Sequence, residues 1–192
     1  MTAAPPRKAA DRDPSAYVLL EVEAVPNALG AYVCAISLGG KRVLTLNREQ
    51  AAAYVTEVTW AVTCAEYDAA VRAQLTAAKM DRTTTAMVVH NIRGNRRPIL
   101  ASATAPLELN PIVSSRTHQP IMQARLGGKR WQWDMDTTRQ HARHVLEVSL
   151  GADMDAQYFR FLRDCNLEED IARHYVTGLR EYMASYNPPS AG

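Results

Sequence analysis

Three clusters of basic side chains are the residues whose types and spacing best fit one chemistry, the binding of phosphate groups. The clusters are Lys41 with Arg42, Lys129 with Arg130, and Arg93 with Arg96 and Arg97. Arginine and lysine form charge-assisted hydrogen bonds to phosphate oxygens, and such contacts give affinity without reading a base sequence. We therefore expect these residues to bind nucleic acid if folding places them on one face. The competing interpretation is that basic turn tips keep sheet edges soluble.

Histidine and carboxylate pairs are the other candidates for chemistry. His141 and His144 lie three residues apart in an expected helix and so share one side of it, a spacing found among metal ligands. Asp134 and Asp136 alternate along an expected strand, where two carboxylates can hold a hard cation or act as acid and base. No extended metal, nucleophile or nucleotide motif accompanies either pair. We expect surface histidines and a solvated carboxylate face, and we predict no catalytic residue, metal ligand or cofactor.

Trp131 and Trp133 alternate with polar residues and should project from one face of a strand. Next to a basic pair, two such rings can stack on nucleic-acid bases. However, the helix that follows this strand needs an apolar face to pack against. We therefore expect both tryptophans to lie in the core.

The composition limits the class of protein. The chain has 192 residues, 47% of them apolar, which suits one ordinary domain or two small lobes. A net charge of +2 is too small to indicate nucleic-acid binding by bulk electrostatics. The sequence has no run of ~18 apolar residues and no signal-peptide pattern, so we expect a cytoplasmic location. Cys34, Cys64 and Cys165 are too widely spaced for a disulfide framework or a zinc site.

The pentapeptide LGGKR occurs at residues 38–42 and again at 126–130, which indicates that one unit is present twice. A strand pattern precedes each copy, and Gly-Gly accepts the positive φ values of a two-residue hairpin turn. Further along the chain, Asn47 is followed three residues later by Gln50, and Thr137 is followed three residues later by Gln140. This spacing is typical of a capping box at a helix start. Two residues inserted in the second copy bring the two helix starts into register.

We therefore predict an α+β fold made of internally duplicated βββα units joined by a β-hairpin connector. The connector hairpin should close on Gly94 and Asn95, because this pair is typical of a tight turn. The predicted divisions are a disordered tail at 1–16, the first unit at 17–79, the connector at 80–106, the second unit at 107–186 and a loose tail at 187–192.

These patterns favour a non-catalytic accessory or interaction protein, a subunit of a larger bacterial assembly with a protein partner. One alternative is a protein that binds nucleic-acid backbone through basic hairpin tips, and a second is an enzyme with an unrecognised carboxylate or histidine site. A contiguous basic face would favour nucleic acid, whereas scattered basic clusters beside an exposed apolar patch would favour a protein partner. A deep pocket with convergent titratable groups would indicate an enzyme.

Overall fold

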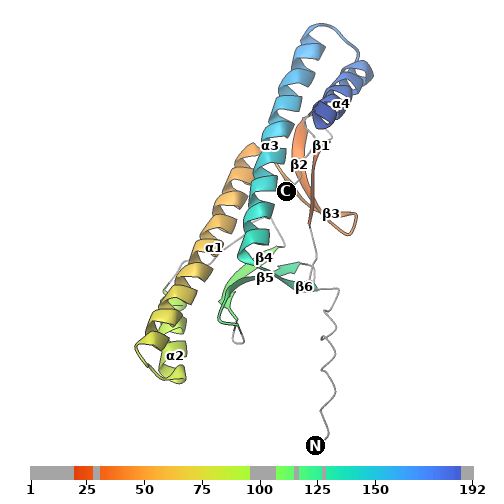
Figure 1. Ribbon diagram of the computed structural model, residues 1–192. Helices are drawn as coiled ribbons and strands as arrows, with labels where there is room; N and C mark the ends of the chain where they lie inside the picture. Colours follow the sequence, from red (N-terminus) through yellow and green to blue (C-terminus); the bar gives the residue numbers. More distant parts are fainter. Residues whose placement is uncertain (1–19, 28–30, 96–106, 115–116, 127–128, 187–192) are drawn as a thin grey trace, which may run out of the picture. The chain divides into compact units, whose positions relative to one another are not determined.

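The computed structural model describes residues 20–27, 31–95, 107–114, 117–126 and 129–186. Within these residues the fold is mixed α and β, with two three-stranded antiparallel sheets and four helices (Figure 1). Three strands and two helices follow one another along the chain, and the same order then repeats. The predicted α+β class is therefore confirmed. The order is compatible with a duplicated βββα unit, which stays a prediction.

The first sheet contains β1 (Glu21–Pro26), β2 (Tyr32–Leu38) and β3 (Lys41–Leu46), with β2 in the centre. Gly39 and Gly40 form the turn between β2 and β3, at φ values of +57° and +73°. Only glycine adopts two successive positive φ values at little cost, and a two-residue hairpin of this kind requires them. The expected turn at the first LGGKR is confirmed.

The second sheet contains β4 (Glu108–Val113), β5 (Pro120–Leu126) and β6 (Lys129–Trp133), with β5 in the centre. β5 and β6 pair antiparallel across the second LGGKR. The two glycines of this copy, Gly127 and Gly128, lie outside the described residues. The flanking strands therefore agree with the expected hairpin, and its turn stays a prediction.

The four helices are α1 (Arg48–Ala77), α2 (Arg82–Gly94), α3 (Met135–Asp164) and α4 (Glu169–Tyr186). The predicted hairpin connector is wrong in its first arm, because that part of the chain is α2. Asp81 caps this helix by accepting hydrogen bonds from the amides of Thr83 and Thr84, both at 3.0 Å. The second arm, residues 96–106, lies outside the described residues. The apolar run before Gly94 fits a strand as well as a helix, and the Asp81 cap decides in favour of the helix.

The two long helices start differently from one another. Asn47 and Gln50 form the predicted capping box, in which each side chain accepts the other residue's amide at 2.9 Å. The predicted box of Thr137 with Gln140 is wrong, because α3 begins one turn earlier. There Asp134 accepts the amide of Thr137 at 2.7 Å. An aspartate is an equally good cap and its charge also suits the positive end of the helix dipole.

This earlier start changes the register between the two halves of the chain. The same spacing now separates Asn47 from Asp134, Tyr54 from His141, and Val58 from Val145. The predicted insertion in the second copy is therefore wrong. Instead, β3 carries one more residue than β6, and the pairing of β2 with β3 shifts register after Ile36.

The chain divides into two compact units, and each draws on both halves of the sequence. Within the described residues, unit 1 is formed by Leu20 together with those of Tyr54–Ala142, and unit 2 by those of Glu21–Ala53 together with Arg143–Tyr186. Unit 1 thus holds most of α1, α2, the sheet β4–β5–β6 and the first turns of α3. Unit 2 holds the sheet β1–β2–β3, the start of α1, most of α3, and α4. Each sheet therefore shares a unit with the long helix of the other half. The ranges 17–79 and 107–186, as units of a duplication, stay predictions.

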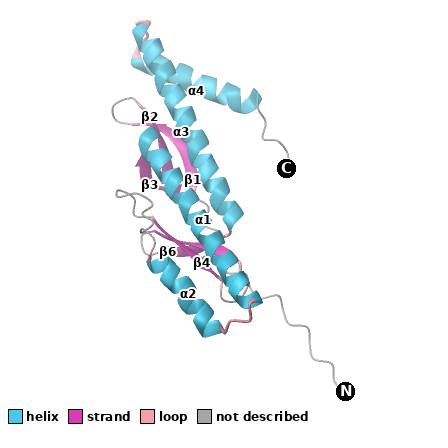
Figure 2. Ribbon diagram, turned by 90° about the vertical axis from the view of Figure 1, so that its left-hand side faces the viewer, coloured by secondary structure: helices cyan, strands magenta, loops and turns pink. Residues whose placement is uncertain are grey.

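The core of unit 1 contains aromatic side chains from its sheet and both long helices. Trp131 and Trp133 are each only 3% exposed, which confirms their predicted place in the core. The imidazole of His141 lies 5.1 Å from the Trp133 ring, and its Nε2 lies 2.8 Å from the Tyr54 hydroxyl. Both views show α2 beside the last turns of α1 (Figures 1 and 2).

The core of unit 2 joins β2 to α3 and α4. The Tyr32 ring meets the Phe159 ring edge to face, with 6.4 Å between centroids. Ala172 and Val176 of α4 complete this cluster and are fully buried. Arg180 extends from α4 over the Tyr32 ring and donates to the carbonyl of Ala24 at 3.0 Å. α4 is thereby fixed to both β1 and β2.

Replacing Asn47 with alanine should lower the free energy of unfolding by about 1 kcal/mol, because the first turn of α1 loses a side-chain acceptor for the Gln50 amide. Urea denaturation of N47A and of Gln50→Ala, with a double mutant, measures the loss. Because the two residues bond reciprocally, their effects should be less than additive. Fully additive effects would show that the two side chains act separately.

Candidate functional site

Four of the predicted nucleic-acid-binding residues are exposed at strand ends. Lys41 and Arg42 open β3 in unit 2, and Lys129 and Arg130 open β6 in unit 1. The remaining residues of that prediction lie elsewhere. Arg96 and Arg97 fall outside the described residues, and Arg93 lies in the last turn of α2. One contiguous basic face therefore stays a prediction.

Arg93 has a structural role in unit 1. Its Nε lies 2.6 Å from the carboxylate of Asp68 on α1, and the Asp68 side chain is completely buried. A buried carboxylate is costly unless a cation compensates it, so Arg93 stabilises the pairing of α1 with α2. Its charge is thus already engaged within the fold.

Replacing Arg93 with alanine should destabilise the protein by about 3 kcal/mol, because it leaves the Asp68 carboxylate buried without this cation. Urea denaturation at neutral pH measures the effect. Arg82→Ala, an exposed arginine at the start of the same helix, is the matched control and should change stability by less than about 0.5 kcal/mol. Equal effects of the two substitutions would contradict a structural role for Arg93.

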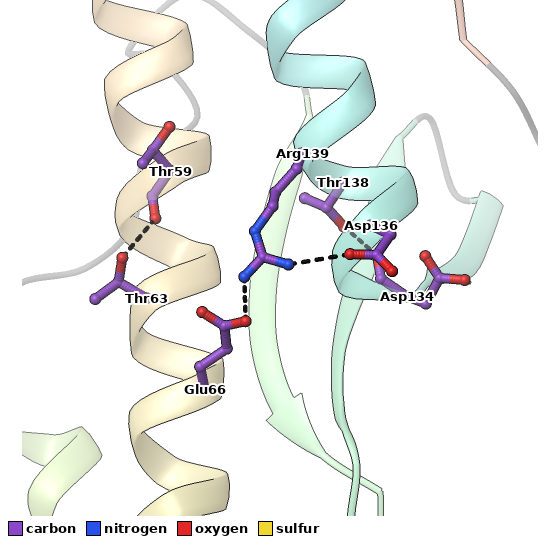
Figure 3. A network of polar contacts seen from close by, with 7 residues as sticks. All are labelled: Thr59, Thr63, Glu66, Asp134, Asp136, Thr138 and Arg139. Carbon is purple, nitrogen blue, oxygen red and sulfur yellow. Dashed lines mark hydrogen bonds and ion pairs between the residues drawn. The ribbon is translucent and has the colours of Figure 1, made fainter. Parts of the chain in front are cut away.

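The predicted carboxylate pair is built into a helix start, not into a strand face (Figure 3). Asp134 caps α3, and the backbone amide of Thr137 lowers the pKa of its carboxyl below the usual value. Asp136 lies in the first turn and pairs with Arg139 at 3.2 Å. Arg139 also forms an ion pair with Glu66 of α1. Asp134 thus stabilises the first turn of α3. Asp136 belongs to an ion-pair network in which Arg139 joins α3 to α1.

The two histidines occupy different environments, so the expectation of two surface histidines is wrong for one of them. His144 is exposed, whereas His141 is 9% exposed and contacts Tyr54 and Trp133. Its position four residues before the buried Val145 is the signal that could have placed it in the core. Among the residues that the structure describes, no three His, Cys, Asp or Glu side chains gather into a metal site.

A hollow with a volume of about 610 Å³ lies within unit 2. Its apolar lining includes Leu46, Ala152 and Phe159. At its edge, Arg48 and Asp153 form an ion pair at 3.0 Å. Asp153 also accepts a hydrogen bond from Gln157 at 3.1 Å. The hollow therefore combines apolar contact surface with charges that already compensate one another.

Cys34 is the thiol that lines this hollow, and its chemistry is that of a core residue. It is 1% exposed, and burial raises the pKa of its thiol to about 11. Because the thiolate is the nucleophilic form, a pKa this high leaves very little reactive sulfur at neutral pH. Cys34 therefore behaves as a small buried apolar residue.

Thiol labelling should distinguish the cysteines by exposure. Cys165 is exposed, whereas Cys34 and Cys64 are buried. With Ellman's reagent at neutral pH, the folded protein should show one fast thiol, and all three cysteines should react in urea. Cys165→Ser should remove the fast phase. A fast phase that survives this substitution would show that a buried cysteine is reactive in the folded state.

Unit 2 also carries large apolar side chains on its surface, which we call the α3–α4 apolar surface. Its members are Leu146, Leu150, Met154 and Phe161 on α3, and Ile171, Tyr175, Leu179, Tyr182 and Met183 on α4. Each is exposed by 39% or more. On each helix most neighbouring members are three or four residues apart, so they form one stripe. Sequence reasoning missed this surface, because an apolar stripe looks the same whether it is buried or exposed.

Comparison with known proteins gave no match to a family model, a curated protein or a solved structure. Among the described helices, none combines the length and the apolar character that crossing a bilayer requires. A functional hypothesis for this chain must therefore be based on its own surfaces.

Proposed function

We propose that this chain is a non-catalytic interaction protein that associates with a second copy of itself through the α3–α4 apolar surface. The observation that carries the proposal is the exposure of five large apolar side chains on α4, in addition to the residues this helix already buries. Apolar side chains three or four residues apart lie next to one another on a helix, and exposed apolar patches are typical of interaction sites.

The apolar stripe on α4 is only partly covered by packing within unit 2. Ala172 and Val176 face the core and are completely buried. Leu179 continues the same side of the helix, and Ile171 and Tyr175 lie beside it; these three side chains are 42%, 45% and 52% exposed. An apolar stripe of this kind is normally covered along its whole length. Covering the exposed part of each of these side chains would contribute roughly 1 kcal/mol.

The residue types also fit an interface. Tyrosine, methionine and phenylalanine are enriched where proteins meet, and tyrosine is among the residues that contribute most binding energy. Tyr175 and Tyr182 lie on α4, while Met154 and Phe161 lie on α3 and are the most exposed apolar residues of that helix, at 70% and 61%. Both helices therefore offer side chains suited to contact with another protein.

The charges of unit 2 favour a second copy as the occupant. Arg180 pairs with Asp155, and Arg173 pairs with Glu169, so these charges beside the apolar surface are compensated within the same chain. The surface itself is uncharged, and an uncharged apolar surface is complementary to an identical one. A twofold contact brings the same patch from each subunit together without like-charge repulsion. Such a self-associating subunit also fits the predicted role in a larger assembly.

Replacing Leu179 with aspartate should weaken self-association more than tenfold, because it places a charge in the centre of the apolar contact. Thr177→Asp is the matched control, since Thr177 is exposed on the same helix but outside the stripe. Analytical ultracentrifugation of the full chain over a range of concentrations measures the dimer constant of each variant.

The wild type and T177D should form dimers at concentrations where L179D is a monomer. A wild-type protein that stays monomeric at about 100 μM would exclude a second copy as the partner, because even weak dimers assemble at that concentration. Equal weakening by the two substitutions would place the contact elsewhere. Circular dichroism of each variant checks that both remain folded.

A further inference from the structure

We infer that the solvent-facing side of the sheet β4–β5–β6 binds the phosphate backbone of a nucleic acid, with Arg125 and Arg130 as the phosphate contacts. The surface lies entirely in unit 1. It is separate from the α3–α4 apolar surface in unit 2, so the inference does not depend on self-association.

The two faces of this sheet differ sharply in chemistry. In one set of cross-strand rows, Leu109 pairs with Ala124 and Ala124 with Trp131, and all three are buried. In the alternate set, Glu108 pairs with Arg125 and Arg125 with Arg130, and all three are exposed. Because side chains alternate between the faces of a strand, the charged row lies on the side opposite the core.

The direct pairing of Arg125 with Arg130 points to an anion. Like charges directly opposite each other destabilise a sheet, and a phosphate group between two guanidinium groups removes that repulsion. Glu108 compensates only in part, since its contact with Arg125 is 3.4 Å long and both side chains are about half exposed or more, at 68% and 48%. In this row two positive charges face one negative charge.

A row of amide side chains lies next to the arginine pair on the same face. Asn110 pairs with Gln123, and Gln123 pairs with Gln132. Asn110 and Gln132 are exposed, and Gln123 is half-buried. Each amide offers both donors and an acceptor, so the row can contact sugars and base edges beside a phosphate. The two rows together form a polar surface on rigid strands with the chemistry that a nucleic-acid backbone requires.

The corresponding side of the other sheet has a different character. There Glu21 pairs with Ser37, and Ser37 pairs with Arg42, so one arginine shares its row with a glutamate. Glu23 adds a second carboxylate two residues along β1. Arg42 therefore provides a matched control. It follows the glycines of the same pentapeptide as Arg130, but its sheet lacks a pair of facing arginines.

Fluorescence anisotropy with a labelled oligonucleotide of roughly 20 nucleotides, single- or double-stranded, tests the inference at 50 and 200 mM salt. The double variant R125Q/R130Q should lose at least tenfold in affinity at low salt. For this variant the slope of log K against log salt concentration should become shallower by about 1.5 to 2, because two phosphate contacts are lost. R42Q should bind within twofold of the wild type. Removing both guanidinium groups without introducing negative charge keeps the effect specific, and circular dichroism checks the fold.

Three results would overturn the inference. These are no salt-dependent binding at low salt, an equal loss in R42Q, and equally tight binding of a labelled polyglutamate peptide. The last result would assign the face to an acidic protein segment.

Gln132 provides a second test of the inference. Gln132→Ala should weaken binding without changing the slope of log K against log salt concentration, because an amide releases no counterions.

Discussion

The length of the two long helices is the constraint on which the rest of the structure depends. α1 and α3 each have 30 residues and so extend about 45 Å. The longest strands have seven residues and span roughly 23 Å. A single small sheet is therefore shorter than such a helix, and part of the helix must bury its apolar side elsewhere. Each helix meets this requirement by starting in one compact unit and continuing into the other.

Sharing the helices in this way couples the two halves of the sequence. Cys34 of β2 lies against the Val145 carbonyl of α3, and Arg48 pairs with Asp153 of α3. In unit 1, Tyr54 of α1 and His141 of α3 form a buried hydrogen bond between the two halves of the sequence. Because a buried phenol requires a hydrogen-bond partner, this contact also fixes the pairing of the two helices. The surfaces that we propose for partners lie outside these contacts.

Local signals in the sequence predicted the local structure well. The Gly39-Gly40 turn, the Asn47 cap and the buried tryptophans follow from the chemistry of a few neighbouring residues. The sequence could not predict which sheet each long helix packs against, because apolar spacing does not identify the partner. The apolar run of α2 is short and fits a strand as well as a helix, so the sequence alone predicts a strand there. The spacing of His141 from Val145 indicates the core, but its hydrogen-bond partner Tyr54 is distant in sequence and cannot be predicted from local patterns. The exposure of the stripe on α4 likewise depends on contacts between distant residues.

The most direct test of this account is to separate the two halves and measure their folding. Residues 1–100 and 101–192, produced as two chains, divide the sequence between α2 and β4. Each sheet is then parted from the long helix that shares its unit. Circular dichroism with urea denaturation should show that neither half alone unfolds cooperatively as a monomer. An equimolar mixture should recover the helical signal and the cooperative transition of the intact chain. A half that folds by itself as a stable monomer would contradict the exchange of helices between the two units.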